Sequence, residues 1–169
     1  MRVALLYGGR SAEHDVSVSS AIAVHQALLE ANHEVIPIAI TLEGKWYKQT
    51  KSPAKEMERT TPLSIKPGEG IFLGESNLAV DAAFATTHGY GGEDGNLQGL
   101  CMLAGIPLAG CDTVSSAIGM HKDLAARLFN SHGIPTVATV VLDRFHLLDL
   151  QAFVMDQFAS ITKQLGPHL

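Results

Sequence analysis

The segment from His88 to Gly95, HGYGGEDG, places one imidazole and two carboxylates among four glycines. Glycines allow a compact backbone and leave side chains uncrowded, which is typical of loops that bind ligands. Glu93 follows His88 by five residues, close enough in a folded loop for the carboxylate to orient the ring. We therefore expect both residues to contact a ligand. The competing interpretation is a structural turn, and we assign that role to Asp94, as the cap of a helix that begins near Gly95.

A second segment, Gly8 to Ser17, reads GGRSAEHDVS and carries the carboxylate of Glu13. The paired glycines permit a tight turn, and a carboxylate beside it suits an ammonium group better than a phosphate. Glu13 alone would more often be a surface or helix-capping residue, although Asp15 or Ser17 is the better expected N-cap. The segment lacks the GxGxxG pattern, so a dinucleotide-binding domain of the Rossmann or flavodoxin kind has little support.

Lys122 begins a predicted helix, where its flexible ammonium group is able to reach a phosphate. An isolated lysine is more often solvated, and the sequence pattern alone does not decide between the two. Cys101 and Cys111 have no metal-ligand spacing, so we expect two reduced thiols in packed positions.

These residues lie between elements that alternate in type. Apolar, β-branched runs bounded by glycines predict buried parallel strands, and apolar residues at the helical period predict helices between them. The fold class is therefore α/β, a mostly parallel sheet flanked by helices. Residues 41–77 are expected to form a hairpin-like excursion, with short strands at 46–47 and 71–73 and no chemistry. The other expected strands are 2–7, 35–40, 79–86, 106–109 and 136–142, and the expected helices are 17–31, 96–104, 114–120, 123–132 and 147–164.

The 169 residues are 46% hydrophobic and 17% charged, which is enough for an ordinary core. A formal net charge of -5 and a pI near 5.9 make nucleic acid an unlikely partner. The N-terminal apolar run is broken at once by Gly8 and Gly9, so it predicts neither a signal peptide nor a membrane span. We expect a cytoplasmic protein without a membrane partner.

Five segments together resemble the motif series of D-alanine-D-alanine ligases, in the family's order and at similar spacing. They are GGRSAEHDVSVSSA, HGYGGEDGNLQG, GIPLAG, SSAIGMHKDLAARLF and GIPTV. By this resemblance, residues 1–112 form the family's N-terminal substrate-binding domain, of the Rossmann-like kind that precedes an ATP-grasp domain. Residues 113–169 then form an incomplete ATP-grasp small subdomain, and the excursion at 41–77 is similar to that of the longer family members.

The resemblance implies a reaction and a set of site residues. ATP phosphorylates the carboxylate of one D-alanine, and the amine of a second attacks the acyl phosphate to give the dipeptide used in peptidoglycan. Glu13 matches the residue that holds the ammonium group of the first D-alanine. His88 matches the histidine near its carboxylate, with Glu93 and Ser17 as orienting residues, and Lys122 matches a lysine that contacts nucleotide phosphates. The implied catalytic residues are Glu13 and His88.

The sequence departs from the family pattern in two places. His121 stands where the family commonly has aspartate, which changes the charge beside the matched lysine. The sequence ends at Leu169, before the second ATP-binding lysine and the carboxylates that bind Mg²⁺ or Mn²⁺ in the family. We therefore expect no metal ligand and no ligase activity in this chain alone, and weak ATP binding at most. The resemblance also implies a homodimer. The second substrate, D-alanine, D-lactate or D-serine, is left open, and the alternative function is a standalone amino-acid-binding module without turnover.

Overall fold

The computed structural model describes residues 1–139, 141 and 162–163. The chain forms two compact units, Met1–Met120 and His121–Leu169. Helix α3, Thr113–Met120, belongs to the first unit, although we assigned its residues to the second domain. The domain boundary at residue 112 stays a prediction.

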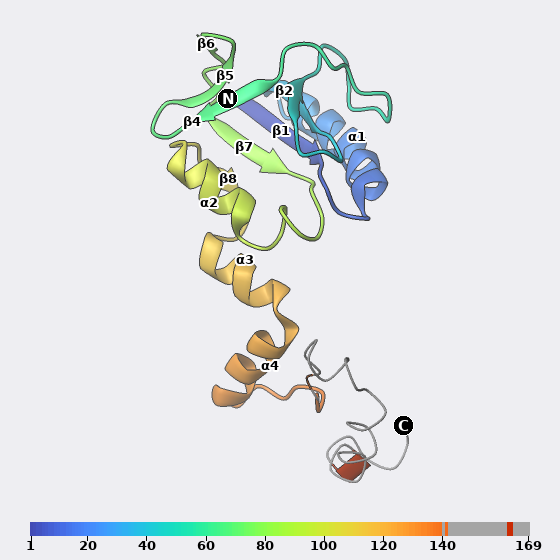
Figure 1. Ribbon diagram of the computed structural model, residues 1–169, viewed down its shortest axis with the longest axis vertical. Helices are drawn as coiled ribbons and strands as arrows, with labels where there is room; N and C mark the ends of the chain where they lie inside the picture. The colour runs from blue at the N-terminus through green and yellow to red at the C-terminus, as the bar shows by residue number, and fades with distance from the viewer. Residues whose placement is uncertain (140, 142–161, 164–169) are drawn as a thin grey trace. The chain divides into compact units, whose positions relative to one another are not determined.

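A five-stranded sheet forms the centre of the first unit (Figure 1). Its strands are β1 Arg2–Gly8, β2 Glu34–Ile40, β3 Trp46–Lys48, β7 Ala82–Ala85 and β8 Leu108–Ala109. They lie in the order β3-β2-β1-β7-β8, and only the edge strand β3 is antiparallel to its neighbour. The mostly parallel α/β sheet expected from the sequence is confirmed.

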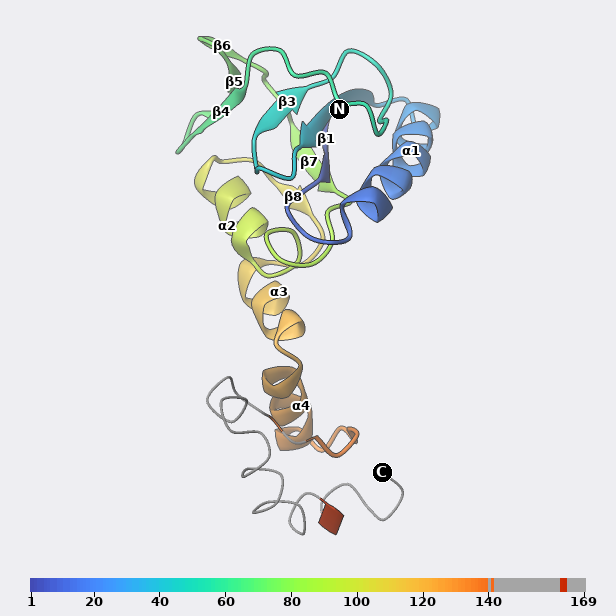
Figure 2. The same ribbon diagram turned by 45° about the vertical axis from the view of Figure 1, so that its right-hand side comes forward.

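Alternate residues of β1 build two core layers, one on each face of the sheet, because successive strand side chains point to opposite faces. Leu5 packs with Val18 and Ala21 of helix α1, His14–Glu30. Leu6 packs on the other face with residues of helix α2, Asn96–Leu103. Figure 2 shows α1 and α2 on opposite sides of the sheet. Both Leu5 and Leu6 are fully buried, so β1 is central to both layers.

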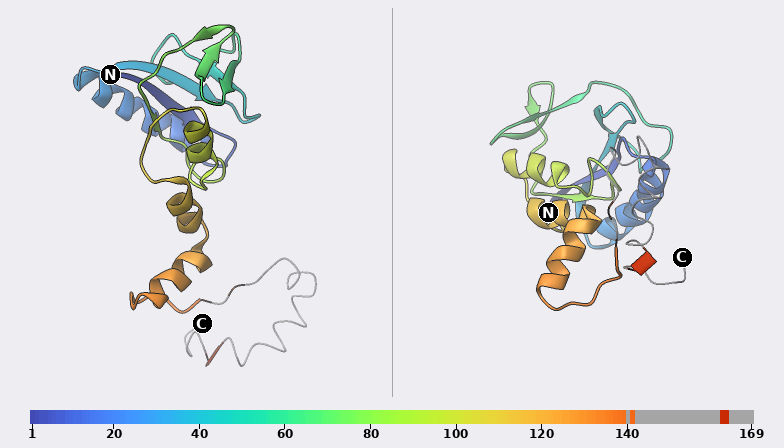
Figure 3. Two further views of the ribbon diagram at one scale, coloured as in Figure 1. Left: turned by 90° about the vertical axis from the view of Figure 1, so that its left-hand side faces the viewer. Right: turned by 60° about the horizontal axis from the view of Figure 1, so that its bottom comes forward.

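The excursion at 41–77 differs from the predicted hairpin. Its first strand, β3, pairs with β2 in the main sheet, whereas the later residues form a separate antiparallel sheet in the order β4-β5-β6 (Figure 3). The three strands are β4 Leu63–Lys66, β5 Gly70–Leu73 and β6 Ser76–Asn77. Ile71 and Leu78 join the core beside α2, which explains why this polar stretch contains an apolar triplet.

Several predicted boundaries were wrong. Helix α1 begins at His14, three residues before the expected start, and strand β7 is shorter than residues 79–86. Ala79 has a positive φ of 49°, which interrupts the extended backbone before the strand begins. Cys101 is buried, and burial raises the pKa of its thiol to about 11, but Cys111 is exposed and not packed as predicted.

The described part of the second unit contains helix α4, Lys122–Ser131. Residues 134–139 and 141, in the region of the predicted strand 136–142, have no regular secondary structure. Most of the predicted helix 147–164 lies outside the described residues. Among the helices that are described, none has both the length and the apolar composition needed to cross a bilayer.

Candidate functional site

The candidate site lies where β1, β2 and β7 end, because the carboxyl ends of parallel strands meet at one edge of a sheet. The loop after β1 turns at Gly8 and Gly9, whose φ angles are +88° and +104°. Gly9 donates its N–H to the carbonyl oxygen of Ile40 at 2.8 Å, and a Cβ at Gly8 would fall on that same oxygen. His14 Nδ1 lies 2.7 Å from the carbonyl oxygen of Gly9 and closes the turn. Local packing therefore requires glycine at position 8, whereas at position 9 the positive φ is what favours glycine.

Ser17 holds this loop in place from the buried side. Its Oγ accepts the N–H of Gly8 at 2.8 Å, and the residue is fully buried. Thr86 donates its hydroxyl to the carbonyl oxygen of Ser17 at 3.1 Å, so one serine joins β1, α1 and the end of β7. The prediction that Asp15 or Ser17 is the N-cap was wrong: the N-cap position is Glu13, without a side-chain hydrogen bond.

The second loop, His88 to Gly95, is held by its own carboxylates. Glu93 Oε2 accepts the N–H of Gly89 at 2.7 Å, and Asp94 accepts the N–H groups of Gly91 and Asn96 at 2.8 and 3.1 Å. Partial burial alone would raise the pKa of Asp94, but these hydrogen bonds outweigh it and keep the pKa below its usual range. Asp94 thus bonds the first turn of α2 as expected, although Gly95 is the N-cap residue.

The His88 ring lies beside Glu93 without a hydrogen bond between them. Nδ1 is 3.9 Å from Glu93 Oε1, an ion-pair distance rather than a hydrogen-bond distance. Nε2 is buried and has no hydrogen-bond partner among the described residues. The Glu93 carboxylate therefore bonds the loop backbone directly but does not hydrogen-bond the His88 ring. Nε2 of that ring remains without a partner among the described residues.

Glu13 brings the two loops together. A Cβ at Gly89 would lie 3.1 Å from Glu13 Oε2 and 3.2 Å from Ser11 Cβ, so the carboxylate rests against the backbone that follows His88. Glycine is needed there both for this approach and for its φ of +68°. Within the described part of the chain, the Glu13 carboxylate has neither a hydrogen bond nor an ion pair. An exposed, uncompensated anion at this position is suited to bind a cationic group.

The remaining predicted residue, Lys122, belongs to the second unit. It is the first residue of α4, and His121 occupies the N-cap position without a side-chain cap bond. The first unit thus brings together Glu13, His88, Glu93 and Ser17. Over the residues the structure describes, no group of three or more His, Cys, Asp or Glu side chains is arranged to hold a metal ion.

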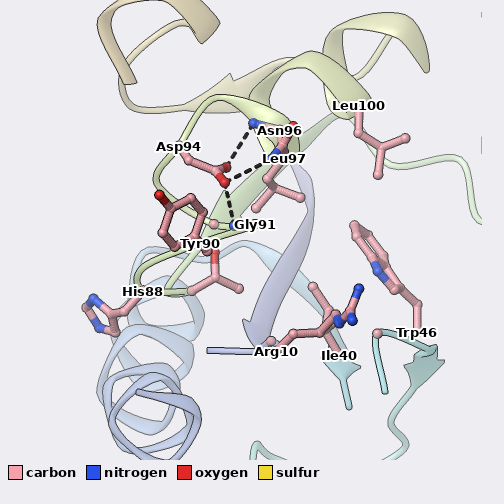
Figure 4. Close-up of a pocket in the computed structure, with 14 residues that line it drawn as sticks. Arg10, Ile40, Trp46, His88, Tyr90, Gly91, Asp94, Asn96, Leu97 and Leu100 are labelled. Carbon is pink, nitrogen blue, oxygen red and sulfur yellow. Dashed lines mark hydrogen bonds between the residues drawn. The ribbon is translucent and has the colours of Figure 1, made fainter. Parts of the chain in front are cut away.

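A pocket of about 500 Å³ opens beside these loops (Figure 4). Its wall includes Arg10, Trp46, Thr87 and Leu100, together with His88. None of the first four was predicted as a site residue, and Trp46 falls in the excursion to which we assigned no chemistry. Only the pairing of β3 with β2 brings the indole to this edge of the sheet, which the sequence pattern does not reveal.

Two neighbouring threonines provide a test of the packing here. Thr86 and Thr87 are 7% and 8% exposed, but only Thr86 uses its hydroxyl, whereas Thr87 Oγ1 has no partner in the described structure. We expect Thr86→Val to lower the free energy of unfolding by about 1 kcal/mol. Thr87→Val should leave it unchanged or slightly raised, because an unsatisfied buried hydroxyl is replaced by a methyl group. Urea denaturation of both variants checks this, and equal losses would contradict the assignment.

Comparison with known proteins gives the same family from sequence and from structure. The family model described as D-ala D-ala ligase N-terminus matches residues 2–111. D-alanine-D-alanine ligase A of Brucella suis is 38% identical over 154 residues, covering 85% of this chain and 44% of the relative. The D-alanine-D-alanine ligase of Corynebacterium efficiens is 40% identical over 167 residues, covering 89% of this chain and 46% of the relative. The chain thus spans less than half the length of these relatives.

Comparison with solved structures points to the same family. The VanG D-Ala:D-Ser ligase from Enterococcus faecalis superposes with a TM-score of 0.77 at 34% identity, covering 94% of this chain and 48% of that one. The D-alanine-D-alanine ligase from Coxiella burnetii gives a TM-score of 0.71 at 29% identity, covering 81% and 43%. Because the family model covers most of the first unit and both loops described above, the chain belongs to the D-alanine-D-alanine ligase family, whose N-terminal region it contains.

Proposed function

We propose that this chain provides one wall of the active site of an ATP-dependent ligase that joins two D-alanine molecules for peptidoglycan synthesis. The observation that carries the proposal is the Glu13 carboxylate, which lies against Gly89 without a partner of its own in the described structure. A zwitterionic amino acid offers an ammonium group for this anion and a carboxylate for the neighbouring histidine loop.

Glu13 binds the ammonium group of the first D-alanine. The carboxylate is exposed and lies at the N-terminus of α1, on a loop fixed by the Gly8 and Ser17 contacts. A fixed loop backbone is important because binding then loses little backbone entropy, and the substrate carboxylate is oriented for reaction.

His88 stabilises the negative charge of the first substrate, first as a carboxylate and then as its acyl phosphate. Its buried, unpartnered Nε2 is a hydrogen-bonding group that a substrate oxygen is able to use. Glu93 holds the ring's loop through Gly89, and Ser17 holds the opposite loop through Gly8. Ser17 therefore acts as an orienting residue from a buried position, without touching the substrate.

Lys122 helps to bind the nucleotide phosphates. It belongs to residues 113–169, which we propose form part of an ATP-grasp small subdomain. The phosphoryl group comes from ATP, whose charge Mg²⁺ or Mn²⁺ would neutralise when bound, and the described residues include no cluster for that metal. Positioning and charge neutralisation provide most of the catalysis in phosphoryl transfer. From the resemblance to the ligase family, the chain alone is proposed to bind D-alanine without ligating it and to form a homodimer.

The test is a titration with D-alanine followed by amide chemical shifts. D-alanine is expected to shift the backbone signals of both loops, around Glu13 and from His88 to Gly95. Glu13→Gln should weaken this binding at least tenfold, because a charge-assisted hydrogen bond to the ammonium group becomes a neutral one. Glu30→Gln is the matched control, since Glu30 is an exposed acid at the far end of the same helix.

Two results would contradict the proposal. One is unchanged D-alanine binding in Glu13→Gln, and the other is binding that shifts neither loop. Mg-ATP, added separately, is expected to cause only small shifts. A standalone binding module would instead show uniform protection from amide exchange over residues 113–139, whereas an incomplete subdomain should exchange rapidly there.

A further inference from the structure

The pocket shown in Figure 4 shares His88 with the proposed D-alanine site but extends away from Glu13. Glu13 does not line it, and in Figure 4 the His88 ring points away from Arg10 and Trp46. Its surface is mainly apolar, with Leu97 and Leu100 across the space from Trp46. A pocket of about 500 Å³ with this lining falls within the usual size range for small-molecule sites.

Arg10 gives the pocket a positive charge that no described residue neutralises. In the part of the chain that the structure describes, its guanidinium has no hydrogen bond and no ion pair. The side chain crosses Gly44, where a Cβ would lie 2.9 Å from Arg10 Cδ. Gly44 therefore leaves room for the arginine stem to lie along the pocket wall.

The carboxylate of Asp94, which also lines the pocket, already accepts hydrogen bonds from the protein. Asp94 accepts N–H bonds from Gly91 and Asn96 and also the side-chain amide of Asn96 at 2.8 Å (Figure 4). It lies opposite Arg10 in the close-up, so it neither neutralises the guanidinium nor adds an unsatisfied anion. Thr87 also lines the pocket, but its hydroxyl oxygen is buried and lacks a partner among the described residues. Among the described residues that line the pocket, Arg10 is thus a charged side chain without a hydrogen bond or an ion pair, and it lies beside an apolar surface.

We propose that this pocket is a second binding site, for a small anion with an apolar or aromatic body. The body lies between Trp46 and the two leucines of α2, and the anionic group pairs with Arg10. An ion pair with a guanidinium beside low-dielectric side chains is stronger than one in open water, so charge discriminates among ligands of the same shape. The site does not depend on the function proposed for Glu13.

Trp46 is the only tryptophan in the sequence, so its fluorescence and indole N–H signal report directly on this pocket. The probes are phenylacetate, neutral phenethyl alcohol and cationic phenethylamine, which share an aromatic body and differ in charge. Phenylacetate is expected to change the Trp46 signals and to bind about tenfold more tightly than the alcohol, with the amine weakest. Arg10→Gln should remove this tenfold preference and leave the affinity for the alcohol unchanged.

Three further variants test whether the preference for an anion arises in this pocket. Arg127→Gln removes an arginine of the second unit that pairs with Asp123, and it should leave the preference intact. Glu13→Gln should also leave phenylacetate binding unchanged, while weakening D-alanine binding. Leu100→Glu, at a position 37% exposed, adds an opposing charge with little expected loss of stability and should abolish phenylacetate binding. The proposal is overturned if no probe changes the Trp46 signals, or if phenylacetate and the alcohol bind equally to the unaltered chain.

Discussion

Gly8→Ala is expected to lower the free energy of unfolding by about 3 kcal/mol or more. A left-handed backbone at φ +88° costs an alanine roughly 1–2 kcal/mol by itself. The added Cβ also collides with the carbonyl oxygen of Ile40, a backbone atom that cannot move aside as a flexible side chain does. Relieving that collision displaces the oxygen that accepts the Gly9 N–H, so a hydrogen bond is lost as well. Urea denaturation monitored by Trp46 fluorescence measures the loss in the first unit.

Gly68→Ala is the matched control for this substitution. Gly68 has a similarly positive φ of +72°, but a Cβ there meets nothing within 4 Å. It should therefore cost only the conformational strain, about 1–2 kcal/mol. The difference between the two variants isolates the contact with Ile40. If Gly8→Ala costs no more than Gly68→Ala, the turn after β1 is not packed as described, and the position assigned to Glu13 loses its basis.

The sequence predicts best where one physical requirement dominates a whole segment. The apolar run in β1 predicts a strand buried on both faces, and Leu5 and Leu6 contribute to opposite core layers as that requires. The parallel order also follows from alternating strands and helices, which places the loops after β1 and β7 at one edge. The closeness of the Glu13 and His88 loops is a consequence of this topology.

Prediction fails where pairing partners are distant in the chain. Trp46 and the triplet at 71–73 both lie in short runs of strand-forming residues, but they belong to different sheets. Nothing in the local pattern distinguishes these pairings, since each strand is stabilised by neighbours outside the segment. The pocket was missed for the same reason: its wall combines Arg10 with Trp46 and α2, three parts of the chain with no shared motif.

Single side-chain contacts are also hard to predict. Ser17 was expected as an N-cap because serine is common at that position. In the structure the helix begins earlier, and the serine turns inward to bond Gly8. The sequence shows a serine near the start of a helix, but it does not show which group that serine hydrogen-bonds. That partner determines whether the residue contributes to the helix or to the site.

Ser17→Ala should therefore have a larger effect than loss of a helix cap. The Gly8 N–H lies where β1 continues beyond the end of β7, and Ser17 Oγ is the acceptor at that position. Without it a buried N–H is left unsatisfied, which costs about 1–3 kcal/mol. Urea denaturation should show a loss of about 2 kcal/mol, and the amide of Gly8 should exchange faster with solvent.

Ser19→Ala on the same helix distinguishes this role from a general effect of losing serine. Ser19 is exposed, and within the described structure its hydroxyl bonds only the carbonyl oxygen of Asp15, one turn back. Its removal should therefore change stability by less than about 0.5 kcal/mol. Because Ser17 holds the loop that carries Glu13, Ser17→Ala should also weaken D-alanine binding in conditions where the protein remains folded. Reduced stability with unchanged D-alanine affinity would show that Ser17 stabilises the fold only. Loss of both, with Ser19→Ala unaffected, would identify one buried hydroxyl as the link between the core and the substrate loop.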